Sequence, residues 1–150
     1  MSEERYTSIY NKALDLLSRR EHSKKEISDK LLIRYDDKDI INSVIQKLNL
    51  NNLINDYRFA ELYVINRKRK GFGPKKIAYE LLGKGINESV SKEIISNEGG
   101  WKEVAKKAFT KKFKEGPCHE PRLKSKQKSF LQNRGFTFRE IESVFANDML

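Results

Sequence analysis

The stretch DYRFAELYVINRKRKGFGPKKIAYELLGKGI, residues 56–86, predicts two helices that meet at a glycine-rich corner. The corner runs from Gly71 to Pro74. Gly73 suits the N-cap of the second helix, and a proline at the first helical position has no backbone N–H to lose. Gly85 is expected to end that helix in a left-handed conformation, which glycine adopts without strain. The stretch therefore reads as helix, corner, helix and tight turn.

The same arrangement recurs at intervals of about fifty residues, a period typical of arrays of helical units. When the chain is divided into three segments of fifty residues, Leu31, Leu81 and Leu131 occupy equivalent positions. Two helix starts carry capping boxes, Ser23 with Glu26 and Thr137 with Glu140. The residues expected at the N-cap of the third helix of each segment are Asp36, Asn87 and Thr137. The chain thus contains three variations on one unit.

These patterns predict an all-α protein built from three tandem three-helix units that resemble helix-turn-helix modules. The units are expected at residues 1–52, 53–99 and 100–150. Each apolar stripe needs only neighbours from its own unit, as in repeat proteins, so we expect three small cores in an elongated or curved array. Trp101 is assigned with Phe109 to the core of the third unit.

The charge of the chain points to an anionic partner. The formal net charge is +10, and it rises from +1 in residues 1–50 to +3 in residues 51–100 and +6 in residues 101–150. Such a balance favours binding to a polyanion or to an acidic groove of another protein. No signal peptide and no run of membrane-spanning length is visible, so we expect a cytoplasmic protein without a membrane partner.

Basic residues gather around the corner, because no acidic residue lies between Glu61 and Glu80. A solvated helix end would explain two or three of these cations. A similar group recurs on the first helix of the third unit, which favours a binding face. We expect Arg67, Arg69 and Lys70 at the exposed end of a helix, where neutralising them leaves the fold intact. The predicted partner-binding or DNA-binding residues are Arg67, Lys68, Arg69, Lys70, Lys75, Lys76, Lys84, Lys106, Lys107, Lys111, Lys112, Lys124, Lys128 and Arg134.

The middle unit combines several motifs at fixed spacings, LINDYRFA (53–60), Arg67, Gly71 to Pro74, Ile77, Glu80-Leu81 and Lys84-Gly85-Ile86. LSRREHS (17–23) and FLQNRGF (130–136) accompany them in the first and third units. Through these residues the chain resembles, over almost its whole length, the RecX family of bacterial regulators of the RecA recombinase. Where the family usually has glycine in the turn of the first unit, this chain has Arg34. A residue other than glycine held left-handed there would cost about 1 kcal/mol, so this departure bears on the geometry of the turn and not on the fold.

The resemblance implies tandem three-helix repeats and a regulator, mainly an inhibitor, of RecA. Such a protein binds the RecA–DNA filament along its groove and limits filament growth, recombination and the SOS damage response. The implied partners are the RecA filament and, secondarily, single- or double-stranded DNA. The resemblance implies a monomer that is not an enzyme.

Other candidate sites are weak. Cys118 is the only cysteine, so no internal disulfide can form. Cys118 and His119 lack the further ligands that a zinc site needs, and His22 is expected to pack in the first corner. The GFGP corner lacks the preceding strand and the spacing of a phosphate-binding loop. We therefore predict no catalytic residue, no metal and no cofactor.

A second class of function stays open, a helix-turn-helix-like protein that acts directly on DNA. The sequence argues mildly against base-specific recognition. The third helix of the second unit, NESVSKEIISN, carries one lysine and two glutamates.

Overall fold

The computed structural model describes residues 2–146 of the chain. Within this range the chain forms nine helices and no strand, which confirms the predicted all-α class. The helices are α1 (Ser2–Arg19), α2 (Lys24–Arg34), α3 (Lys38–Leu50), α4 (Asp56–Arg69), α5 (Pro74–Gly83), α6 (Glu88–Glu98), α7 (Trp101–Lys112), α8 (Pro121–Asn133) and α9 (Phe138–Phe145). None of these described helices combines the length and the apolar composition that crossing a membrane requires.

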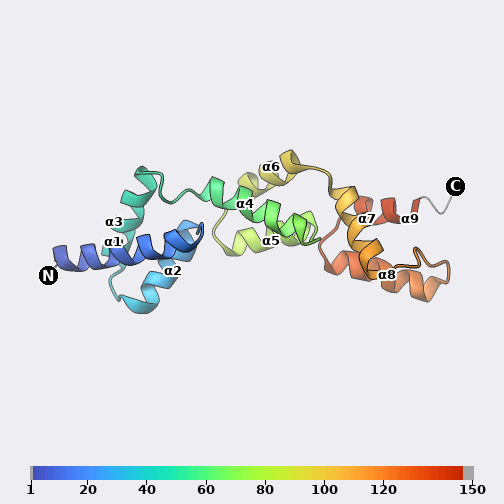
Figure 1. Ribbon diagram of the computed structural model, residues 1–150, viewed down its shortest axis with the longest axis horizontal. Helices are drawn as coiled ribbons and strands as arrows, with labels where there is room; N and C mark the ends of the chain where they lie inside the picture. Colours follow the sequence, from blue (N-terminus) through green and yellow to red (C-terminus); the bar gives the residue numbers. More distant parts are fainter. Residues whose placement is uncertain (1, 147–150) are drawn as a thin grey trace.

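The helices form an elongated row of three units, as Figure 1 shows, with α1–α3 at one end, α4–α6 in the middle and α7–α9 at the other end. Each unit has its own cluster of buried apolar side chains, which confirms the prediction of three small cores. The equivalent residues Leu31, Leu81 and Leu131 are all fully buried, one in each core. The fifty-residue period of the sequence therefore corresponds to a repeated packing unit.

Most helix ends follow the predicted capping chemistry. Ser23 and Thr137 complete both capping boxes, with reciprocal side-chain and backbone hydrogen bonds. Gly73 is the N-cap of α5, and Pro74 occupies its first turn. Gly85 follows α5 with a φ of 82°, the left-handed conformation expected of it. Local residue chemistry alone was enough to place these boundaries.

The turn between α2 and α3 departs from the prediction. Arg34 is the last residue of α2, and Tyr35 follows it in an extended conformation with φ −122°, so no left-handed residue is needed there. The N-cap of α3 is Asp37 and not Asp36, since the side chain of Asp37 accepts a hydrogen bond from the backbone N–H of Ile40. The extended turn delays the start of α3 by one residue.

Trp101 begins α7 but packs in the core of the second unit. Its indole N–H donates a hydrogen bond of 2.9 Å to the carbonyl oxygen of Ile95 on α6. The chain turns between α6 and α7 over Gly99 and Gly100, which have φ values of 60° and 73°. The assignment of Trp101 to the same core as Phe109 is therefore wrong, because this tight turn holds the first residue of α7 against α6.

The joint between the first and second units consists largely of polar side-chain contacts. They join the backbone N–H of Lys24 to Asp56, and the side chains of Lys84 to Glu26 and of Arg58 to Glu21. All three bring the start of α2, or the turn before it, against the second unit. Contacts of this kind depend on charge and hence on pH and salt.

The joint between the second and third units includes backbone hydrogen bonds as well as the packing of Trp101. The N–H of Gly73 donates to the carbonyl oxygen of Arg134 at 2.8 Å, and the N–H of Lys75 donates to that of Gly135 at 2.9 Å. A Cβ atom on Gly73 would lie 2.6 Å from the carbonyl oxygen of Gly135. The two units thus meet too closely for a side chain, and this contact sets α4 against α7.

Candidate polyanion-binding groove

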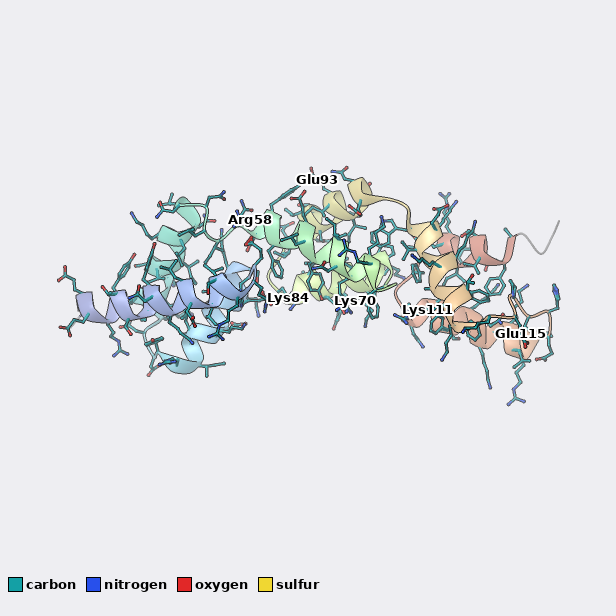
Figure 2. The ribbon with its side chains drawn as sticks, viewed as in Figure 1. Arg58, Lys70, Lys84, Glu93, Lys111 and Glu115 are labelled. Carbon is teal, nitrogen blue, oxygen red and sulfur yellow. The ribbon has the colours of Figure 1, made fainter. Side chains whose placement is uncertain are left out.

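A groove of about 750 Å³ lies between the second and third units. It is lined by the C-terminal half of α4, the corner at Gly71, the α6–α7 connection and one side of α7 and α8. Figure 2 shows Lys70 at the end of α4 and Lys111 on α7 on the two sides of this boundary. The groove therefore brings together residues that are some forty positions apart in the sequence, as in other repeat arrays.

Seven basic side chains and two acidic ones, Glu98 and Glu103, line the groove, which leaves it with a net positive charge. All seven basic residues were predicted binding residues. They are Lys68, Arg69, Lys70, Lys107, Lys111, Lys112 and Arg134. Among the described residues only Lys68 pairs with a carboxylate, that of Glu98, at 3.2 Å. The guanidinium of Arg134 donates to the carbonyl oxygen of Lys70 at 3.5 Å. The remaining cations carry uncompensated charge, which attracts an anion.

The groove also has apolar walls. They are formed by Ile65, Val104, Ala108 and Phe130. Val104, Ala108 and Phe130 also pack against the cores of the units. Ile65 is half-buried and belongs to none of the three core clusters of the described residues. The site therefore offers apolar contact as well as positive charge.

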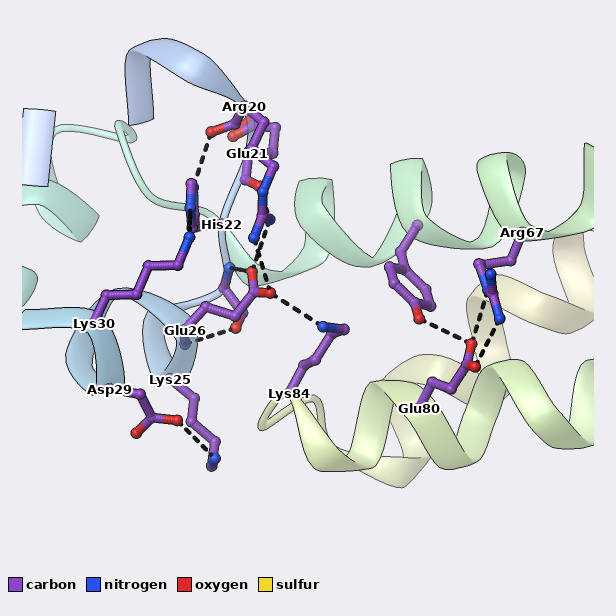
Figure 3. Close-up of polar contacts among 12 residues, drawn as sticks. Arg20, Glu21, His22, Lys25, Glu26, Asp29, Lys30, Arg67, Glu80 and Lys84 are labelled. Carbon is purple, nitrogen blue, oxygen red and sulfur yellow. Dashed lines mark hydrogen bonds and ion pairs between the residues drawn. The ribbon is translucent and has the colours of Figure 1, made fainter. Parts of the chain in front are cut away.

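Arg67 stabilises the second unit and does not line the groove. Its guanidinium donates two hydrogen bonds, of 2.9 and 2.8 Å, to the carboxylate of Glu80, and Cζ lies 3.8 Å from the ring centre of Phe72. Tyr63 donates a further hydrogen bond of 2.8 Å to the same carboxylate. The Arg67 side chain is 21% exposed, so the expectation of a solvated helix end is wrong for this residue. Figure 3 shows the contact between Arg67 and Glu80.

These contacts fix the ionisation of Glu80 and Tyr63. Burial opposes the charge of Glu80, but hydrogen bonds from Arg67 and Tyr63 outweigh it and lower the pKa of Glu80. Burial and the hydrogen bond to Glu80 raise the pKa of Tyr63 to about 12. At neutral pH the carboxylate is therefore charged and the phenol keeps its proton, as the hydrogen bond between them requires.

The other predicted binding residues lie outside the groove. Three of them pair with carboxylates, Lys76 with Glu80, Lys84 with Glu26, and Lys128 with Glu142. Lys75 and Lys106 are exposed. Lys124 lies 5.4 Å from the ring centre of Phe145. The structure therefore separates the predicted set into groove cations, structural cations and solvated cations.

Glu26 is the centre of the first joint, as Figure 3 shows. Its carboxylate accepts hydrogen bonds from Arg20 and Lys84, both at 3.1 Å, and from the backbone N–H of Ser23, also at 3.1 Å. Burial opposes its charge, but these hydrogen bonds outweigh the effect and lower the pKa of Glu26 to about 2. Lys84 was predicted as a binding residue, but here it holds two units together.

His22 packs in the first corner, as predicted, with 1% of its surface exposed. Its ring nitrogens lie 3.0 Å from the carbonyl oxygen of Arg20 and 2.8 Å from the ammonium nitrogen of Lys30. Burial lowers the pKa of His22. A neutral ring can accept the hydrogen bond from the lysine, so the histidine serves packing at this position.

Sequence analysis missed Gly135 and Gln127. Gly135 has a φ of 98°, and a Cβ there would lie 2.5 Å from the backbone nitrogen of Lys76. Gln127 is buried at the position equivalent to the apolar Ile27 and Ile77. Its amide donates to the carbonyl oxygen of Gly116 and accepts from the backbone N–H of Cys118, which fixes the loop before α8. Gly135 lies fifty residues after Gly85, and this equivalence in the repeat could have identified it.

No group of three or more histidine, cysteine or acidic side chains that could hold a metal forms within residues 2–146. Cys118 is half-buried, with a free thiol. The chemistry of the groove is that of electrostatic and apolar binding.

Comparison with known proteins gives matches along the whole row of units. Sequence models of RecX match in three places, the first three-helix domain at residues 10–48, the second at residues 55–95 and the third at residues 102–145. "Regulatory protein RecX" of Legionella pneumophila is 36% identical over 141 residues, which cover 93% of each chain. "Regulatory protein RecX" of Halorhodospira halophila is 34% identical over 140 residues, covering 93% of this chain and 87% of the relative.

The fold is also found in solved structures. The crystal structure of RecX from Lactobacillus salivarius aligns with a TM-score of 0.83 and 26% identity, over 99% of both chains. A second structure, of a regulatory protein RecX, aligns with the same TM-score at 24% identity and supports the fold alone. The likeness includes all three units and their order.

Proposed function

Because the chain belongs to the RecX family, we propose that it regulates the RecA recombinase, mainly as an inhibitor. It binds the RecA–DNA filament along the helical groove of the filament and limits filament growth. Recombination and the SOS damage response are restrained as a result. The chain works by binding and not as an enzyme, without a cofactor, as a monomer in the cytoplasm.

The observation that carries this proposal is the gathering of unpaired cations around the groove between the second and third units. A nucleoprotein filament presents both DNA phosphate and acidic protein surface, and either attracts such a groove. The elongated row of units supports the proposal further, since units at 1–52, 53–99 and 100–150 can follow a filament over several subunits.

Binding to coated and bare DNA tests the proposal. The affinity of the labelled chain is measured by fluorescence anisotropy at physiological salt on single-stranded DNA, on duplex DNA and on RecA-coated DNA. A RecA regulator binds the coated DNA most tightly, and RecA filaments without nucleotide serve as the control for filament state. Equal or tighter binding to bare DNA would contradict the proposal.

Direct DNA binding by the helix-turn-helix-like units is the second candidate, and the same unpaired cations favour it. The geometry of α6 opposes base-specific reading, because this helix carries Glu88, Glu93 and Glu98 with Lys92 as its only cation. A recognition helix in the major groove needs donors aimed at base edges. We therefore expect binding to bare DNA that is weak, independent of sequence and sensitive to salt.

A further inference from the structure

We propose that the groove between the second and third units is a docking site for a short acidic segment of a protein that also carries apolar side chains. This inference rests on the proposed function in one respect, since the segment belongs to the protein that the chain regulates. It goes beyond that function by naming the site and the chemistry of its occupant.

The net positive charge of the groove favours an anionic occupant, since seven basic side chains line it against Glu98 and Glu103. Arg69, Lys70, Lys107, Lys111 and Lys112 form no ion pair with a carboxylate among the described residues, and Lys68 has one with Glu98. Lysine side chains are point charges that can each meet a separate carboxylate. A segment that spaces its acidic residues to match the lysines of α4 and α7 therefore gains from every one of them.

The apolar wall of the groove favours an occupant that carries apolar side chains as well as negative charge. Ile65 lies on the groove side of α4, half-buried, and takes no part in the cores of the described residues. A phosphate chain would leave the Ile65 side chain exposed to water, and burial of apolar surface would contribute nothing to its binding. An apolar side chain beside an acidic one would remove the wall from water, which is favourable. The combination of walls therefore selects a peptide over a polyphosphate.

The geometry of the groove also disfavours nucleic acid. Its aromatic residue, Phe130, has the Arg134 guanidinium at 5.3 Å and the Lys112 ammonium at 6.0 Å from its ring centre. These cations take the place that a stacked base would need. At about 750 Å³ the groove has the capacity of a pocket for side chains, and a duplex would touch only its rim.

The test uses the full chain and synthetic probes, without RecA. The first probe is a labelled peptide that combines glutamates with leucines. The second has serine in place of each leucine and thus the same charge, and the third is an oligothymidylate of equal charge. The variant Ile65→Gln removes the contribution of α4 to the apolar walls and keeps a good helix former. Leu62→Gln on the same helix is the matched control, because Leu62 is 43% exposed and lies outside the groove.

We expect the leucine peptide to bind more tightly than both other probes, and Ile65→Gln to weaken it by about tenfold, the loss typical of one apolar anchor. Leu62→Gln should leave its affinity unchanged, and neither variant should change oligothymidylate binding. Equal effects of the two variants, or equal binding of the two peptides, would overturn the inference. The preference for RecA-coated DNA is measured in a separate experiment. A negative result with the peptides would therefore contradict this inference without contradicting the proposed function.

Discussion

At the scale of single residues, Gly73 is the position where the second joint has least room. A Cβ atom there would lie 2.5 Å from the backbone nitrogen of Phe136 and 2.6 Å from the carbonyl oxygen of Gly135. At Gly83, late in α5, a Cβ meets nothing within 4 Å. Gly73→Val should therefore cost about 1–3 kcal/mol through overpacking. Gly83→Ala should stabilise the chain by up to about 1 kcal/mol, because alanine is the better helix former.

Thermal unfolding followed by circular dichroism compares these two glycine variants. The valine variant should melt well below the wild type and the alanine variant at or above it. Identical melting of the two would mean that the close approach between the units does not contribute to stability.

Arg67 and Arg69 are neighbours in the sequence with different tasks. Arg67→Gln removes two hydrogen bonds from the half-buried carboxylate of Glu80 and leaves it only the longer of its two ion pairs, that with Lys76 at 3.8 Å, which should cost about 1–3 kcal/mol. Arg69 is exposed and unpaired among the described residues, so Arg69→Gln should change stability by no more than about 0.5 kcal/mol. Urea denaturation of both variants measures the difference. Equal midpoints would show that the ion pair with Glu80 is dispensable.

At the scale of helices and joints, the first joint should weaken in acid. The pKa of Glu26 falls from an ordinary 4.5 to about 2 in the folded chain, so its ionised form stabilises the fold. This contribution is complete above about pH 4.5 and is lost as the pH falls toward about 2. Glu26→Gln should be less stable at pH 7 and should lose less stability than the wild type between pH 5 and pH 3, both by urea denaturation. Parallel losses in the two proteins would assign the acid sensitivity to other carboxylates.

The helices, most of their caps and the three-unit order could be predicted from the sequence, because they depend on local chemistry. The capping box of Ser23 and the left-handed turn at Gly85 are examples. The predicted environments of Trp101 and Arg67 were wrong for a different reason. Their neighbours, Ile95 and Glu80, come from other helices, and a single sequence does not show which helix a side chain will face.

The candidate site could be predicted only in part. An excess of basic residues on α4 and α7 was visible, as Lys70 and Lys111 illustrate. The groove itself depends on how the units pack, which the backbone contact between Gly73 and Gly135 determines. Ile65 was not predicted as part of the site, because its place in the groove follows from the packing of α4 against α7.

At the scale of the whole molecule, the elongated row places the basic groove at a joint held by backbone hydrogen bonds. The first unit is attached mainly through charged side chains. The second and third units should therefore act together as one binding body.

RecA-dependent ATP hydrolysis in the presence of two variants of equal charge tests the central claim most directly. Lys70→Gln, Lys107→Gln and Lys111→Gln together remove three charges from the groove. Lys75→Gln, Lys106→Gln and Lys126→Gln remove three exposed charges outside it. The groove variant should fold normally and lose most of its inhibition, while the outside variant inhibits like the wild type. Equal inhibition by both variants would show that the groove is not the site through which the chain regulates RecA.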